Sequence, residues 1–90
     1  MRLTRILRGE KTVSIDIDVE ECTIRRIMFS GDFFAYPEEN IEKLEESLKN
    51  CRNIECISNA FKTIENILFI GVNWETLKSE VVNMWRALCK

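Results

Sequence analysis

The sequence predicts an α+β domain in which a small antiparallel sheet of two to three N-terminal strands is covered on one face by two to three C-terminal helices. Apolar and polar residues alternate strictly over residues 13–19, as expected for a strand with one buried and one solvated face. After Pro37 the apolar residues recur every three or four positions, which is the helical period. The period changes at Gly31, so we expect the sheet to end there.

Three strands are predicted in the N-terminal part, at residues 3–8, 12–19 and 24–29. Gly9-Glu10 is a plausible turn for the first hairpin, whereas residues 20–23 make the second turn without a glycine. In the third strand the buried phase shifts between Ile24 and Ile27. A β-bulge or a late start of the strand would absorb this shift.

The helical period predicts three helices, one running from Pro37 to about Asn50 and the others beginning after Asn53 and after Asn73. Pro37 suits a first helical position, and each asparagine can cap the helix that follows it. Residues 67–70 are apolar throughout and too short to show a period. They therefore either extend the second helix, which ends before Gly71, or form a buried loop.

Length and charge narrow the classes of protein. We expect residues 1–90 to form one domain because the chain is short, and we expect it in the cytoplasm because no signal-like or membrane-length apolar run is present. A net charge of −2 gives no reason to expect nucleic-acid binding. The charge is uneven, with a balance of +3 in residues 1–11 and −4 in residues 32–49. This polarity could orient a protein partner, or it could reflect two solvated faces.

The four cysteines do not form a recognisable metal motif. Only Cys51 and Cys56 are close in sequence, and the chain has no histidine to complete a mixed zinc site. Without a secretory signal we expect unpaired, buried thiols, with a metal or redox role as the alternative.

A catalytic set is also not evident, and we expect no catalytic residue in this chain. It has no histidine for general-base chemistry, no glycine-rich phosphate loop and no paired cysteine motif. Asp16 and Asp18 share the polar face of a strand and could bind a divalent cation, but two carboxylates without further oxygen ligands are a weak signal, and a solvated sheet face is the favoured explanation. Glu42, Glu45 and Glu46 lie on one side of the first helix, where solubility explains them.

The turn at residues 30–34 is the strongest candidate site. Gly31 tolerates positive φ, Asp32 can accept bonds from nearby backbone N–H groups, and Phe33 and Phe34 place two rings together. These residues could form a tight turn with aromatic plugs. They could also hold a ligand or a partner protein.

Residues 24–34, followed by Pro37-Glu38-Glu39 and the helix at 41–48, resemble the C-terminal domain of lipoate–protein ligases. In that family a strand ends in a Gly-Asp-Phe-Phe turn and a helix rich in Glu and Leu follows. Cys22 departs from the pattern, because a glycine would be expected in that turn. The family activates lipoate with ATP to lipoyl-AMP and transfers the lipoyl group to a lysine of a lipoyl acceptor domain.

The resemblance implies an accessory subunit of a two-chain ligase, because the family's catalytic lysine and lipoate-binding motif belong to a separate large domain. The expected partners are the large catalytic subunit and, in addition, the acceptor domain. ATP, Mg and lipoate are then expected in the complex, with none bound by this chain alone. The domain would act as a lid, with the turn from Gly31 to Phe34 at its edge and Arg8, Arg25 and Arg26 supporting the charge of the triphosphate.

Two other classes stay open at this point. One is a free-standing interaction module, similar in fold to iron–sulfur assembly scaffolds, which only the cysteines support. The other is a small ligand-binding or regulatory domain that has no enzyme partner.

Overall fold

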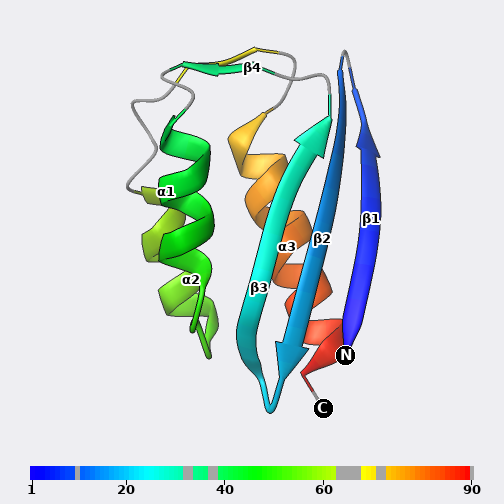
Figure 1. Ribbon diagram of the computed structural model, residues 1–90, viewed down its shortest axis with the longest axis vertical. Coiled ribbons are helices and arrows are strands. Elements are labelled where there is room, and N and C mark those ends of the chain that lie inside the picture. The colour runs from blue at the N-terminus through cyan, green and yellow to red at the C-terminus, as the bar shows by residue number, and fades with distance from the viewer. Residues whose placement is uncertain (10, 32–33, 37–38, 63–67, 71–72, 90) are drawn as a thin grey trace.

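The computed structural model describes residues 1–9, 11–31, 34–36, 39–62, 68–70 and 73–89 (Figure 1). In chain order the elements are β1 (Arg2–Arg8), β2 (Thr12–Glu20), β3 (Thr23–Gly31), β4 (Phe34–Tyr36), α1 (Glu39–Leu48), α2 (Ile54–Lys62), β5 (Leu68–Ile70) and α3 (Trp74–Leu88). The first three strands form an antiparallel sheet in the order β1-β2-β3. The predicted α+β class is confirmed.

The alternating residues make β2 the central strand of this sheet. Its apolar side chains Val13, Ile15, Ile17 and Val19 are at most 2% exposed, while the residues between them are half-buried. Strands β1 and β3 pair on either side of it. One face of the sheet therefore belongs to the core, as the alternation predicts.

A β-bulge accounts for the phase shift in β3. Asp18 pairs with Arg26 and Val19 pairs with Ile24, so Arg25 is an extra residue in the strand. Because of this extra residue, both Ile24 and Ile27 face the core, at 0% and 4% exposure. The predicted bulge is confirmed.

The turn between β2 and β3 forms without glycine. Glu21 and Cys22 both adopt positive φ, at 50° and 63°. The indole of Trp85 in α3 donates its Nε1–H to the carbonyl oxygen of Cys22 at 2.8 Å. A disulfide joins Cys22 to Cys89, which follows α3, with the two Cα atoms 4.5 Å apart. Two bonds from the end of α3 thus hold this left-handed turn.

The helices cover the core face of the sheet, and their apolar stripes complete the core (Figure 1). The fully buried side chains of the helices are Leu44, Leu48, Ile57, Phe61, Leu77, Val81 and Met84. The predicted caps are present. Asn53 Oδ1 accepts the Cys56 N–H at 2.8 Å, and Asn73 Oδ1 accepts the Glu75 N–H at 2.8 Å. Among the described residues, no helix combines the length and the apolar composition that crossing a bilayer would need.

Two expectations about the helical part are wrong. Residues 68–70 neither extend α2 nor form a loop; they form β5, which pairs antiparallel with β4. A backbone partner far away in sequence decides this segment, and periodicity cannot detect such a partner. The first helix also ends at Leu48 rather than at Asn50, whose φ of 72° ends the helix in a left-handed conformation.

The expectation of unpaired thiols is also wrong. Besides Cys22 and Cys89, Cys51 and Cys56 form a disulfide across the connection between α1 and α2, with Cα atoms 5.5 Å apart. All four cysteines of the chain are paired. The expectation rested on compartment alone, whereas the fold brings each pair to bonding distance.

Candidate functional site

Gly31 ends β3 in a conformation that requires glycine. Its φ is +140°, and a Cβ at this position would overlap the carbonyl oxygen of Thr12 on the neighbouring strand. Asp32 and Phe33 lie outside the described residues, and Phe34 begins β4, where its backbone pairs with Ile70.

The three predicted arginines do not gather around Gly31. Arg8 ends β1 opposite Thr12, so it lies at the same end of the sheet as Gly31. Arg25 and Arg26 are exposed and lie toward the other end of β3, where five residue steps along the strand place Arg26 about 17 Å from Gly31. Only Arg8 therefore shares this end of the sheet with the turn.

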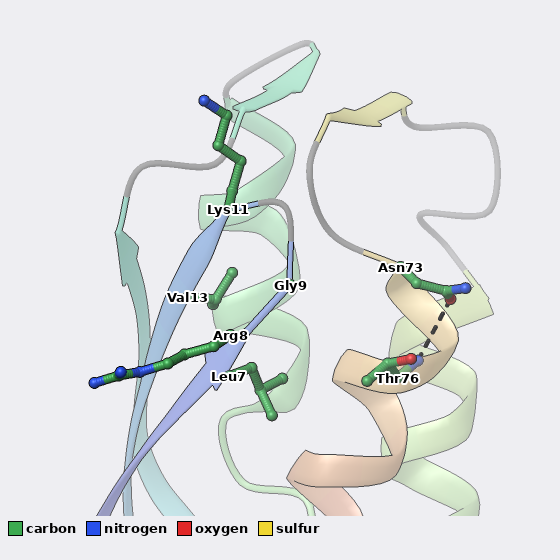
Figure 2. Close-up of a pocket in the computed structure, with 7 residues that line it drawn as sticks. All are labelled: Leu7, Arg8, Gly9, Lys11, Val13, Asn73 and Thr76. Atoms are coloured by element: carbon green, nitrogen blue, oxygen red, sulfur yellow. Dashed lines mark hydrogen bonds between the residues drawn. The ribbon is translucent and has the colours of Figure 1, made fainter.

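A hollow of about 190 Å³ opens at this same end, between the β1–β2 hairpin and the first turn of α3 (Figure 2). Its lining residues are Leu7, Arg8, Gly9, Lys11, Val13, Asn73 and Thr76. Figure 2 shows Leu7 and Thr76 on its two sides, while the charged ends of Arg8 and Lys11 extend away from it. The hollow is thus lined chiefly by apolar atoms.

Ion pairs occupy the aspartates that could have bound a cation. Arg2 donates its Nε to Asp16 Oδ1 at 2.9 Å and its Nη2 to Asp16 Oδ2 at 2.7 Å. Asp18 Oδ1 lies 3.5 Å from the N-terminal ammonium of Met1. Among the described residues, no group of three or more histidine, cysteine, aspartate or glutamate side chains could hold a metal ion.

Replacing Asp16 by asparagine should lower stability slightly at neutral pH, and the difference should vanish in acid. The hydrogen bond from Arg2 lowers the pKa of the Asp16 carboxyl below its usual value. Stability from a lowered pKa is present above the unfolded pKa of about 3.9 and is lost as the pH falls through the folded pKa. Thermal unfolding of both proteins across the acid range would measure this. A difference that stays constant down to the most acid conditions would contradict the assignment.

Glu45 has a structural contact that the sequence does not predict. Its Oε2 accepts the backbone N–H of Phe29 at 2.8 Å. One of the three glutamates that solubility was expected to explain therefore also binds the edge of β3. Glu45 directly follows Leu44, which belongs to the buried stripe of the helix. This adjacency is the signal in the sequence that could have suggested a contact with the sheet. A carboxylate that accepts a backbone N–H fixes α1 against this edge.

These features describe a small α+β domain in which Asp16, Asp18 and Glu45 make structural contacts. Within this class, the family model described as bacterial lipoate protein ligase C-terminus matches residues 10–84. The chain therefore belongs to the family of lipoate protein ligase C-terminal domains. The resemblance inferred from the turn at Gly31 and the helix that follows is confirmed.

A protein sequence and a chain of a solved structure, both from Thermoplasma acidophilum, are similar to this chain. Lipoate-protein ligase A subunit 2 is 33% identical over 54 residues, which span 60% of this chain and 56% of that relative. The match thus covers little more than half of the relative's length. The second is a chain from the solved structure of a bi-partite lipoate protein ligase and its lipoyl domain, with a TM-score of 0.74 and 28% identity. That similarity covers 83% of this chain and 88% of the other chain.

Proposed function

We propose that this chain is a non-catalytic accessory subunit of a two-chain lipoate–protein ligase. In this role it assembles with a large catalytic subunit in the cytoplasm and is needed for the activation of lipoate to lipoyl-AMP. The observation that carries the proposal is the structural similarity to a chain of the bi-partite ligase, at a TM-score of 0.74 over 88% of that chain. The family match over residues 10–84 supports the same class of function.

The physical contribution of such a subunit is to enclose the activation step. Adenylation joins a carboxylate to the α-phosphate of ATP and releases pyrophosphate, so negative charge must be offset and water must be kept out. A domain that covers the catalytic subunit supplies the enclosure. The turn from Gly31 to Phe34 forms the edge of this cover, and Arg8, Arg25 and Arg26 are the candidates for charge support. ATP with its Mg²⁺, and lipoate, are substrates of the complex.

Omitting this chain should abolish lipoyl-AMP formation and spare lipoyl transfer. The test mixes the catalytic subunit, ATP, Mg²⁺, lipoate and an acceptor domain with and without this chain, and measures pyrophosphate release. A second reaction starts from preformed lipoyl-AMP and measures transfer to the acceptor. We expect at least about a hundredfold difference in the first reaction, which corresponds to the loss of a water-excluding, charge-stabilised site, and little difference in the second.

The same assay tests whether the turn itself contributes to the activation of lipoate. Phe33→Ala and Asp32→Ala chains that still bind the catalytic subunit should activate lipoate more slowly than the wild type. Normal rates with a bound variant would remove the turn from the mechanism. Normal lipoyl-AMP formation without any small chain would overturn the proposed function itself.

The disulfides disfavour the alternative of an iron–sulfur scaffold. A cluster needs cysteine thiolates, and all four cysteines of this chain are bonded to one another. The feature that supported this alternative therefore has a structural role.

A further inference from the structure

The two edges of the main sheet differ. On the β3 edge, the Ile24 N–H donates to the Cys51 carbonyl at 2.9 Å, and the Ile24 carbonyl accepts the Asn50 N–H at 2.7 Å. Further along, Glu45 accepts the Phe29 N–H at 2.8 Å. The chain therefore covers this edge with its own groups at two places.

Strand β1 is the terminal strand on the other side of the sheet, and among the described residues no backbone group outside β2 is bonded to it (Figure 1). Met1 and Val19 exchange both backbone bonds, at 2.8 and 2.9 Å, and the Gly9 N–H donates to the Lys11 carbonyl at 3.1 Å. Odd-numbered residues of β1 thus bond to β2. Since bonding alternates along an antiparallel pair, the N–H and C=O groups of Thr4, Ile6 and Arg8 point away from the sheet. They can accept an added strand.

Charge selects what can pair with this edge. Strand β1 contains Arg2, Arg5 and Arg8 and no acidic residue. If two copies paired antiparallel about Arg5, Arg5 would face Arg5 of the second copy, and Arg2 would face Arg8 of the second copy. The repulsion between these like charges opposes self-association. Arg2 and Arg5 already pair with Asp16 and Glu80, at 2.7 and 2.9 Å. In the described part of the chain, Arg8 is exposed and has no ion pair, so it remains available for a carboxylate.

The hollow of Figure 2 borders the same strand on its core-facing side. Leu7 of β1 lines it together with Val13 and Thr76, whereas the Arg8 side chain extends from the opposite face. Successive side chains of an added strand also alternate between the two faces. One residue could therefore place an apolar side chain in the hollow while its neighbour places a carboxylate beside Arg8. Ile6, which is 55% exposed, lies two positions before Arg8 on that outer face.

We propose that β1 is the docking edge for an extended acidic segment of the catalytic subunit, which adds a fourth strand to the sheet. An acidic side chain of this segment pairs with Arg8, and a neighbouring apolar side chain enters the hollow beside Leu7. The inference rests on the proposed function, which supplies the partner. The family match begins at residue 10 and so does not include β1. The docking edge therefore lies outside the region matched to the family.

A matched pair of variants tests the backbone contact. Thr4→Pro removes an N–H that points away from β2, whereas Thr4→Ala loses the same hydroxyl and keeps the N–H. Calorimetric titration with the catalytic subunit should give a Kd at least about tenfold weaker for Thr4→Pro, and a wild-type Kd for Thr4→Ala. Circular dichroism of each free variant checks that it is folded. Wild-type affinity in a folded Thr4→Pro chain would overturn the proposal and leave the proposed function standing.

Hydrogen exchange on the wild-type protein tests the same contact without a substitution. The amides of Thr4, Ile6 and Arg8 should exchange rapidly in the free chain and slowly in the complex. A complex that protects α1 or α2 and leaves these amides unchanged would contradict the inference. Failure to form any complex would remove the proposed function as well. A dimer of the chain alone that Thr4→Pro dissolves, with no loss of binding to the catalytic subunit, would assign the edge to self-association instead.

Arg8→Glu tests the charge contact at this edge. Pairing with an acidic segment predicts a Kd about tenfold weaker and more sensitive to salt. An unchanged Kd would overturn the docking role. Arg52→Glu, at an exposed position between α1 and α2, is the control for the same charge change.

Discussion

Removing the disulfide between Cys22 and Cys89 should lower the free energy of unfolding by about 4 kcal/mol, because it closes a loop of 67 residues in the unfolded chain. The shorter loop between Cys51 and Cys56 should contribute about 2 kcal/mol by the same entropic estimate. A small domain has a total stability of about 5–15 kcal/mol. The long-range bond should therefore decide whether the end of α3 stays on the sheet at elevated temperature.

The measurement compares denaturant unfolding of two double variants, Cys22→Ala with Cys89→Ala and Cys51→Ala with Cys56→Ala. Each removes one disulfide, so the second variant is the control for general loss of a bond. Alkylation of the folded wild-type protein, followed by intact-mass analysis, should detect no free thiol. Equal losses of stability in the two variants, or four alkylated thiols, would contradict this account.

Replacing Gly31 by alanine should destabilise the domain by at least about 2 kcal/mol. An L-residue held at a φ of +140° costs about 1–3 kcal/mol, and relief of the overlap with the Thr12 carbonyl costs about 1–3 kcal/mol more. The obstructing atom belongs to the backbone of β2, so no side chain can rotate away. Thermal unfolding and circular dichroism would record the loss.

Ser30→Ala provides the control for the Gly31 substitution. Ser30 precedes Gly31 in β3 and is exposed, so alanine there should change stability by less than about 1 kcal/mol. Similar losses for the two variants would show that the conformation at Gly31 is not the cause. A stable Gly31→Ala protein would mean that β2 and β3 can separate at this end without cost.

The elements that the sequence predicts correctly are those that local patterns specify. The alternation around Ile15 and Ile17 depends only on neighbours along the strand, and Asn73 caps α3 through bonds within one helical turn. Strand β5 and the two disulfides depend instead on partners that are distant in sequence or brought together by packing. Four consecutive apolar residues or isolated cysteines carry no local signal of such partners.

Part of the candidate site can likewise be predicted from local sequence, and part of it cannot. The need for glycine at position 31 can be inferred from residue type, and its positive φ supplies the physical reason. The hollow beside Leu7 cannot be inferred, because its two walls come from β1 and from the first turn of α3. The difference between the two sheet edges also cannot be inferred from the sequence, because it depends on the hydrogen bonds that Asn50 and Glu45 form with β3.

The bulge at Arg25 restricts how the length of this chain can change during evolution. The two halves of β3 bond to different partners, Ile24 to the connection after α1 and Phe29 to Glu45 within α1. Deleting one residue between them would turn one half over and expose its apolar side chains, since strand residues alternate between faces. Insertions and deletions should therefore accumulate in the β1–β2 hairpin and be rejected within β3, where a single residue sets the phase of both halves.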